Sequence, residues 1–105
     1  MTIRWMPLAE HDLEAAYDYA QQDSENAAKQ LVARIFSAVG MLTRYPLAGR
    51  EGRVQGTREL AVARTPYVIA YRICQDEIQI LAVLHGAQRW PTTFSPNWGT
   101  KPAET

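Results

Sequence analysis

The chain has 105 residues, of which 47% are hydrophobic and 21% charged, with equal numbers of basic and acidic side chains. These values are typical of one folded domain and exclude a disordered, fibrous or membrane-spanning chain. A domain of this size has a modest core, which excludes a large enzyme with several substrates. One cysteine, Cys74, excludes an internal disulfide framework. With no visible signal peptide, we expect a cytoplasmic protein.

The two halves of the chain carry opposite charge. Residues 1–26 contain one basic residue, Arg4, and six acidic residues, whereas residues 44–72 contain six arginines and two glutamates. A guanidinium group binds carboxylate or phosphate through two parallel hydrogen bonds. The cluster of arginines therefore predicts a cationic surface for an anionic partner. The alternative for each single arginine is an ordinary solvated position on a loop or strand.

The N-terminal half predicts a short strand followed by two antiparallel helices. Residues 2–5 favour a strand that ends before a proline. Residues 7–22 carry apolar side chains at helical spacing, with acidic residues in the first turns. A second helix begins after the capping residues Asp23 and Ser24. We expect it to end at residues 45–46, because a residue before proline avoids the helical conformation.

The C-terminal half predicts a long loop and then an antiparallel sheet. Residues 45–57 contain proline and glycine without periodicity, which indicates a loop. Three strands are expected after it, at residues 58–63, 67–73 and 78–84. The last is apolar on both faces, so we expect it inside the sheet. The predicted fold is α+β, a strand and a helical hairpin followed by a three-stranded antiparallel sheet, with one domain over residues 1–94 and an irregular tail over 95–105.

Few residues in this sequence support metal, cofactor or covalent chemistry. His11, His85 and Cys74 lack ligand-like spacing, so we expect no metal site. The loop glycines neither follow a strand nor open a helix, so we expect no nucleotide cofactor. Nucleophilic attack by Cys74 would need His85 as its base, and a structural cysteine is favoured. Metal-free RNA cleavage would need a base, an acid and cations, which the strands could supply from Glu59, Arg64, Tyr71, Arg72, His85 and Arg89.

Several short motifs occur in a distinctive order. They are residues 46–50 (PLAGR), Arg58-Glu59-Leu60, a strand ending in Tyr71-Arg72, and Val83-Leu84-His85-Gly86 followed by Arg89. Together with the order of the predicted elements, they make residues 3–94 resemble the RelE/ParE superfamily of bacterial type II toxin-antitoxin toxins. RelE-like members cleave messenger RNA in the ribosome, and ParE-like members inhibit DNA gyrase. The fold alone does not choose between these two activities.

Compared position by position, this chain lacks most of the RelE-like ribonuclease pattern. The lysines, arginines and tyrosine of that pattern would fall on or near Glu59, Ala61, Val68, Gln88 and Phe94. An apolar side chain cannot stabilise the negative charge that develops during RNA cleavage. The resemblance therefore implies the ParE-like branch, without an enzymatic reaction.

We therefore predict a toxin that acts on DNA gyrase and forms a hetero-oligomer with a ParD-like antitoxin, with no membrane partner. The antitoxin would contribute a flexible acidic or amphipathic segment that folds along the helices and the sheet edge. The expected contact residues are Arg58, Arg64, Arg72, His85, Arg89 and Trp90. A structural alternative for Arg72 is an ion pair with Glu59. Two other functions stay open: a ribosome-dependent endoribonuclease that uses Glu59, Arg64 and His85, and a non-toxic remnant that binds antitoxin.

Overall fold

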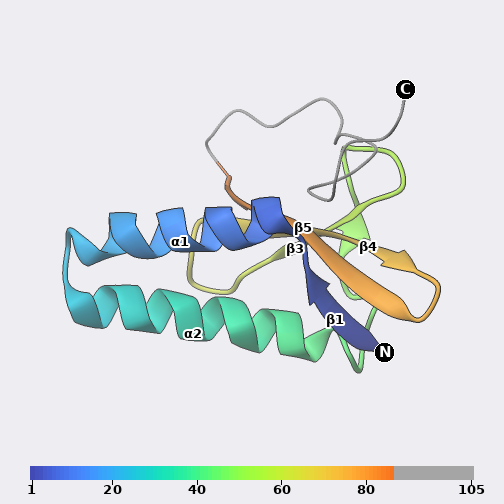
Figure 1. Cartoon of the computed structure of the whole chain (residues 1–105), viewed down its shortest axis with the longest axis horizontal. Helices are drawn as coiled ribbons and strands as arrows, with labels where there is room; N and C mark the ends of the chain where they lie inside the picture. The colour runs from blue at the N-terminus through green and yellow to red at the C-terminus, as the bar shows by residue number, and fades with distance from the viewer. Residues whose placement is uncertain (87–105) are drawn as a thin grey trace.

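In the computed structural model, which describes residues 1–86, two helices pack on one face of a five-stranded sheet (Figure 1). The elements are β1 (Thr2–Trp5), α1 (Pro7–Gln21), α2 (Glu25–Met41), β2 (Arg50–Glu51), β3 (Arg58–Ala61), β4 (Tyr67–Cys74) and β5 (Glu77–His85). The strand order is β1-β5-β4-β3-β2; β1 runs parallel to β5 and the other neighbours are antiparallel. The predicted α+β class is therefore confirmed.

Two strands extend the predicted three-stranded sheet at its edges. β1 pairs with the first half of β5, from Thr2 opposite Glu77 to Trp5 opposite Ile80. β2 lies inside the segment predicted as a loop, and that prediction was wrong for these two residues. β2 is too short to show alternation, and pairing with β3 defines it.

The boundaries of two predicted elements also differ from the structure. The second helix ends at Met41, before residues 45–46, and the chain continues through turns in which the Thr43 hydroxyl bonds the Gly40 carbonyl. Such a local side-chain bond competes with the helix. β3 ends at Ala61, two residues early, because a turn begins there. The expected domain boundary at residue 94 lies outside the described residues.

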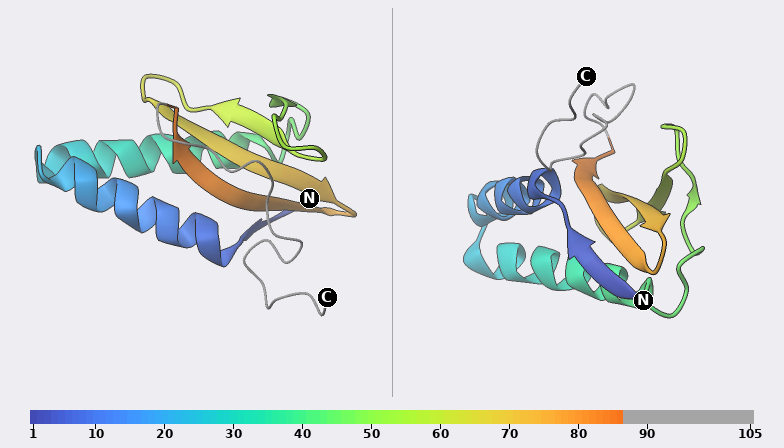
Figure 2. Two further views of the ribbon diagram at one scale, coloured as in Figure 1. Left: turned by 90° about the horizontal axis from the view of Figure 1, so that it is seen from above. Right: turned by 45° about the vertical axis from the view of Figure 1, so that its right-hand side comes forward.

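The helices cover one face of the sheet, and Figure 2 shows both of them on the same side. The core between the layers contains Ile35 and Val39 from α2 and Ile69, Tyr71, Ile78, Ile80 and Val83 from the sheet. A second buried cluster contains Met6, Val54, Ala70, Leu81, Ala82 and Leu84. Since β5 contributes to both clusters and lies between β1 and β4, its predicted interior position is confirmed.

A β-bulge explains how β5 serves both clusters. Ala70 pairs with Ala82 and Tyr71 pairs with Ile80, so Leu81 is an extra residue on β5. An extra residue reverses the side-chain alternation beyond it. Val83 therefore joins Ile80 in the cluster under the helices.

A side chain of α1 accepts a hydrogen bond from the β5 backbone at a position beyond the end of β1. The Asp12 carboxylate on α1 accepts a hydrogen bond from the Val83 amide at 3.0 Å. Burial raises the pKa of Asp12, while this hydrogen bond and the nearby His11 act in the opposite direction. Asp12 therefore joins helix to sheet at some electrostatic cost.

Over residues 1–86, neither helix has the length and apolar character needed to cross a membrane.

The segment between α2 and β2 is held against the sheet by a buried tyrosine. The Tyr71 hydroxyl donates to the Pro46 carbonyl at 2.7 Å and accepts the Gly49 amide hydrogen at 2.9 Å. Gly49 approaches so closely that a Cβ atom there would lie 2.7 Å from the Tyr71 ring and 2.8 Å from the Glu59 carbonyl. The predicted loop is thus fixed in position at this point, and only glycine fits there.

We expect Gly49→Ala to destabilise the fold, because the added methyl group displaces Tyr71 or β3. A cost of about 1–3 kcal/mol is typical of overpacking in a core. Gly40→Ala is the matched control, since a Cβ atom at this helical position meets nothing within 4 Å. It should stabilise the protein by about 0.5–1 kcal/mol. Denaturant unfolding of both variants measures the difference; equal stabilities would contradict the assigned packing.

Candidate functional site

The predicted contact residues lie at opposite ends of the sheet. β4 runs back from Tyr67 toward Arg72, and its pairing places His85 opposite Tyr67 and Gln79 opposite Arg72. Arg64 lies in the turn that precedes Tyr67, whereas Arg58 pairs with Tyr71 near the other end. The structure therefore brings Arg64 and His85 to one end and Arg58 and Arg72 to the other. Arg89 and Trp90 lie outside the described residues.

The end with Arg64 and His85 contains the hairpin pocket, a cavity of about 370 Å³ between the tip of the helical hairpin and the β3–β4 turn. Its lining includes Tyr19, Asp23, Arg34, Arg64, Tyr67 and His85. Tyr67 and His85 meet edge to face, with ring centroids 5.4 Å apart. Burial, and to a smaller extent the nearby Tyr19, raises the pKa of Tyr67, so its phenol stays neutral at physiological pH. The pocket thus combines aromatic walls with cationic side chains.

The backbone of the β3–β4 turn determines the position of Arg64. Arg64 has a positive φ of 62°, a conformation that glycine and asparagine adopt more readily. The next residue closes the turn, since the Thr65 hydroxyl donates to the Val62 carbonyl and accepts the Tyr67 amide hydrogen. An arginine therefore occupies a position where a side chain with a Cβ atom is strained.

At the opposite end, the two predicted contact arginines have structural partners. Arg58 donates to the Gly49 carbonyl at 2.7 Å and so joins β3 to the fixed loop. Arg72 donates through Nε to the Gln79 side chain, which in turn donates to Glu77. Among the described residues Glu59 forms its ion pairs with Arg50 and Arg53, and the suggested pair of Arg72 with Glu59 is not found there. Both arginines also line a smaller cavity of about 240 Å³.

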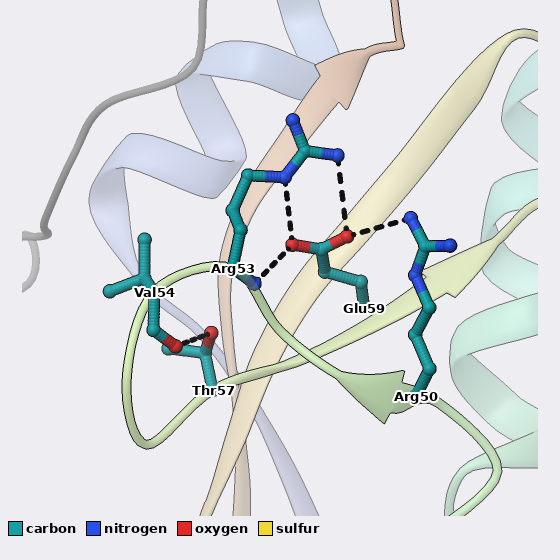
Figure 3. Close-up of polar contacts among 5 residues, drawn as sticks. All are labelled: Arg50, Arg53, Val54, Thr57 and Glu59. Carbon is teal, nitrogen blue, oxygen red and sulfur yellow. Dashed lines mark hydrogen bonds and ion pairs between the residues drawn. The ribbon is translucent and has the colours of Figure 1, made fainter.

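Glu59 is the buried centre of a polar cluster that closes the loop around β2, and its partners Arg50 and Arg53 are exposed (Figure 3). The Glu59 side chain is only 3% exposed. The carboxylate accepts the Arg53 backbone amide hydrogen at 2.8 Å, the Arg53 Nε hydrogen at 3.1 Å and the Arg50 guanidinium at 3.1 Å. Nearby, the Thr57 hydroxyl donates to the Val54 carbonyl and tightens the following turn. The bonds from Arg50 and Arg53 hold the Glu59 carboxylate in one position within the fold.

The environment of Glu59 holds its pKa below the ordinary value of 4.5. Burial alone raises this pKa, but the backbone amide of Arg53 and the side chains of Arg53 and Arg50 favour the charged form more strongly. The carboxylate is therefore ionised near neutral pH. Its hydrogen-bonding capacity is used by these internal partners, which makes it a poor proton acceptor for a substrate.

The structure does not bring together the three residues of the ribonuclease alternative. Glu59 pairs with Ala70, which belongs to the cluster on the sheet face away from the helices. His85 pairs with Tyr67, which packs against the core under the helices. Directly paired residues share a face, so Glu59 and His85 lie on opposite faces of the sheet. Arg64 lies near His85 alone.

Two other candidate groups also fail to form a reactive pair. Cys74 pairs with Glu77 at the β4–β5 turn, at the far end of β4 from His85, so this base does not reach the thiol. Tyr71 is fully buried, and burial raises its pKa although Gly49 and Arg58 act against the shift. Within residues 1–86, no three His, Cys, Asp or Glu side chains gather closely enough to hold a metal ion.

Sequence reasoning missed Arg34, Arg50 and Arg53. Arg34 lines the hairpin pocket beside Ala27, Gln30 and Leu31 of the same helix. Their spacing of three and four residues places them on one stripe, a signal that could have identified Arg34 as facing the strands. No comparable spacing identifies Arg50 and Arg53, because their partner Glu59 lies on another strand.

We expect Glu59→Gln to lower the free energy of unfolding at neutral pH by about 1–3 kcal/mol, since charge-assisted hydrogen bonds are lost. The pKa of Glu59 is lowered by folding, so the unfolded chain takes up its proton first as the pH falls. The stabilisation is thus complete above the ordinary value of 4.5 and is lost as the pH falls through the folded pKa. The difference between wild type and variant should therefore shrink as the pH falls below 4.5.

Denaturant unfolding across this pH range measures the effect. Glu51→Gln is the control, because Glu51 is an exposed glutamate on the neighbouring strand, and it should change stability little at any pH. A difference between wild type and Glu59→Gln that stays constant with pH would contradict the buried ionised carboxylate.

Comparisons with known proteins agree on the family of this chain. The family described as the ParE toxin of the type II toxin-antitoxin system parDE matches residues 3–90. The chain is 46% identical to Y4kP of Sinorhizobium fredii, described as a candidate toxin, over 85% of this chain and 92% of that protein. It is 37% identical to toxin RelE2 of Caulobacter vibrioides, over 80% of this chain and 91% of that one.

Comparison with solved structures indicates the same family. The solved structure of the chromosomal ParDE toxin-antitoxin system from P. aeruginosa contains a chain that matches with a TM-score of 0.75 and 32% sequence identity. The match covers 81% of this chain and 95% of that chain. Since the family match spans most of the sequence and the closely related fold supports it, the chain belongs to the ParE family of type II toxin-antitoxin toxins.

Proposed function

We propose that this chain inhibits DNA gyrase in the cytoplasm and that a ParD-like antitoxin neutralises it. The observation that carries the proposal is the match to the ParE toxin family over residues 3–90. The ParE-like branch of the superfamily acts on gyrase, and this chain lacks the cations of the ribonuclease branch at the corresponding positions. The activity is therefore proposed as binding to a protein target, without a catalysed reaction.

The geometry of the described residues supports a binding function. Glu59 is committed to two arginines, and Tyr71 is committed to the loop. General acid and base catalysis requires groups that can reach the substrate and exchange protons with it. Neither of these side chains is available in that way, whereas arginines and aromatic side chains at the surface suit protein recognition.

The α2–β3 groove is a suitable place for an antitoxin segment. It has a volume of about 450 Å³ and runs between α2 and β3; its lining includes Arg34, Ala38, Met41, Leu60, Val62 and Arg64. Within residues 1–86, β2 pairs with Arg58 and Glu59, and Leu60 and Ala61 have no strand on that side. An extended segment could pair with this edge and place apolar side chains in the groove. The toxin and antitoxin would then form a hetero-oligomer.

The proposal is tested by gyrase supercoiling and DNA-cleavage assays with antitoxin-free, folded protein. We expect inhibition of supercoiling with accumulation of cleaved DNA, and relief of both effects when antitoxin is added. A parallel assay measures cleavage of ribosome-bound messenger RNA. Absence of any effect on gyrase would contradict the proposed target, and a folded chain that is harmless on expression would indicate the non-toxic remnant.

A ribosome-dependent endoribonuclease is the second candidate, because one relative bears the name RelE2. The two candidates differ in their dependence on Glu59. A catalytic Glu59 predicts that Glu59→Gln lowers RNA cleavage by about 10²-fold or more. Gyrase inhibition predicts an unchanged effect per folded molecule, since the carboxylate is buried away from solvent. Circular dichroism at the assay temperature verifies that the variant is folded, and loss of gyrase inhibition by folded variant would contradict our proposal.

A further inference from the structure

The hairpin pocket and the α2–β3 groove meet at two arginines. Arg34 of α2 and Arg64 of the β3–β4 turn line both hollows. Figure 2 shows the β3–β4 connection on the same side of the molecule as α2. Residues of both elements line the two hollows. A segment that follows the groove toward the tip of the hairpin would therefore pass both arginines.

Neither arginine is neutralised within the part of the chain that the structure describes. The ion pairs among residues 1–86 are Arg4–Glu77, Lys29–Glu25, Arg50–Glu59 and Arg53–Glu59. The acidic side chain lining either hollow is Asp23, at the far side of the hairpin pocket from the groove. Two cations beside apolar surface, with no internal anion between them, provide a place for an external one.

The backbone of Arg64 is a second, independent observation. A turn residue with φ of 62° is usually glycine or asparagine, yet here it carries a long cationic side chain. Strain of this kind persists where the side chain has a role beyond the fold. The other non-glycine residue with positive φ is Gln75, in the β4–β5 turn at the opposite end of the sheet, among residues 1–86. It provides a matched comparison.

The chemistry of the walls indicates the kind of ligand. The surface on either side of the two arginines is largely apolar, with Leu31 and Tyr67 in the hairpin pocket and Ala38 and Leu60 in the α2–β3 groove. A nucleic acid carries a charge at every nucleotide and would need cations along its whole path. A peptide can instead place one acidic side chain between the guanidinium groups and apolar side chains on either side.

We propose that Arg34 and Arg64 form a carboxylate-binding site for an acidic residue of the antitoxin segment that runs from the α2–β3 groove into the hairpin pocket. The inference rests on the proposed function for the identity of this partner. The paired guanidiniums fix the register of the segment, because the acidic residue can satisfy both of them at one position only. Flanking apolar residues then enter the hollows on either side.

Isothermal titration of the chain with its full-length antitoxin tests this site. Arg64→Asn removes the charge and gives the turn a residue that tolerates positive φ, so the melting temperature should be unchanged or higher while affinity falls roughly 10- to 100-fold. Arg34→Gln should weaken binding similarly. The controls are Gln75→Asn, which makes the same backbone change at the other end, and Arg4→Gln, which removes a cation from the opposite edge of the sheet; both should bind like wild type.

A double-mutant cycle identifies the partner residue. Each acidic residue of the antitoxin segment is changed to its amide, and one of these changes should weaken binding to wild type but have little effect on Arg64→Asn. Wild-type affinity in folded Arg64→Asn, or equal losses with Arg4→Gln, would overturn the site while leaving the proposed function intact. A wild-type chain that binds no antitoxin would contradict the proposed function, and the inference with it. Displacement of bound antitoxin by a single-stranded oligonucleotide that Arg64→Asn no longer binds would overturn the peptide assignment.

Discussion

The buried carboxylate of Glu59 determines how the irregular part of this chain is organised. A charge in the core is stable only with close partners, and the backbone and side chain of Arg53 together with Arg50 supply them. The segment that precedes β3 therefore folds back along the sheet, and Val54 joins the buried cluster on the face away from the helices. We infer that β2 depends on this cluster, because a strand of two residues is not stable without further contacts.

The arginines of residues 44–72 fall into two groups, those that bond acceptors within the fold and those that do not. Arg50, Arg53 and Arg58 are tied to acceptors within the fold, and Arg72 bonds a glutamine on β5. Four of the six arginines over residues 44–72 therefore have partners within the fold, although the composition of this segment suggests a single binding surface. Arg64 differs from these four because its turn directs it toward α2, where it shares two hollows with Arg34. The cationic surface left for an anionic partner is thus smaller than the number of arginines in the sequence indicates.

Sequence periodicity predicted the elements whose side chains alternate regularly. Both helices and the alternation of β4 follow from apolar spacing, and Ser24 caps α2 through the Ala27 amide. The bulge at Leu81 and the pairing of β2 could not be predicted, because each depends on a partner strand distant in sequence. The separation of Glu59 from His85 had the same origin: the face on which a residue lies follows from register, which spacing within one strand does not determine.

The pairing of β1 with β5 has a consequence for how the protein is made. The first strand of the chain pairs with the last described strand, and 75 positions separate Thr2 from its partner Glu77. During synthesis the helical hairpin can form early, but β1 has no strand to join until β5 has left the ribosome. Completion of the sheet therefore requires translation through β5, so a product truncated before Glu77 would leave β1 without its partner strand. The order of pairing thus restricts the complete sheet to chains that have been translated beyond β5.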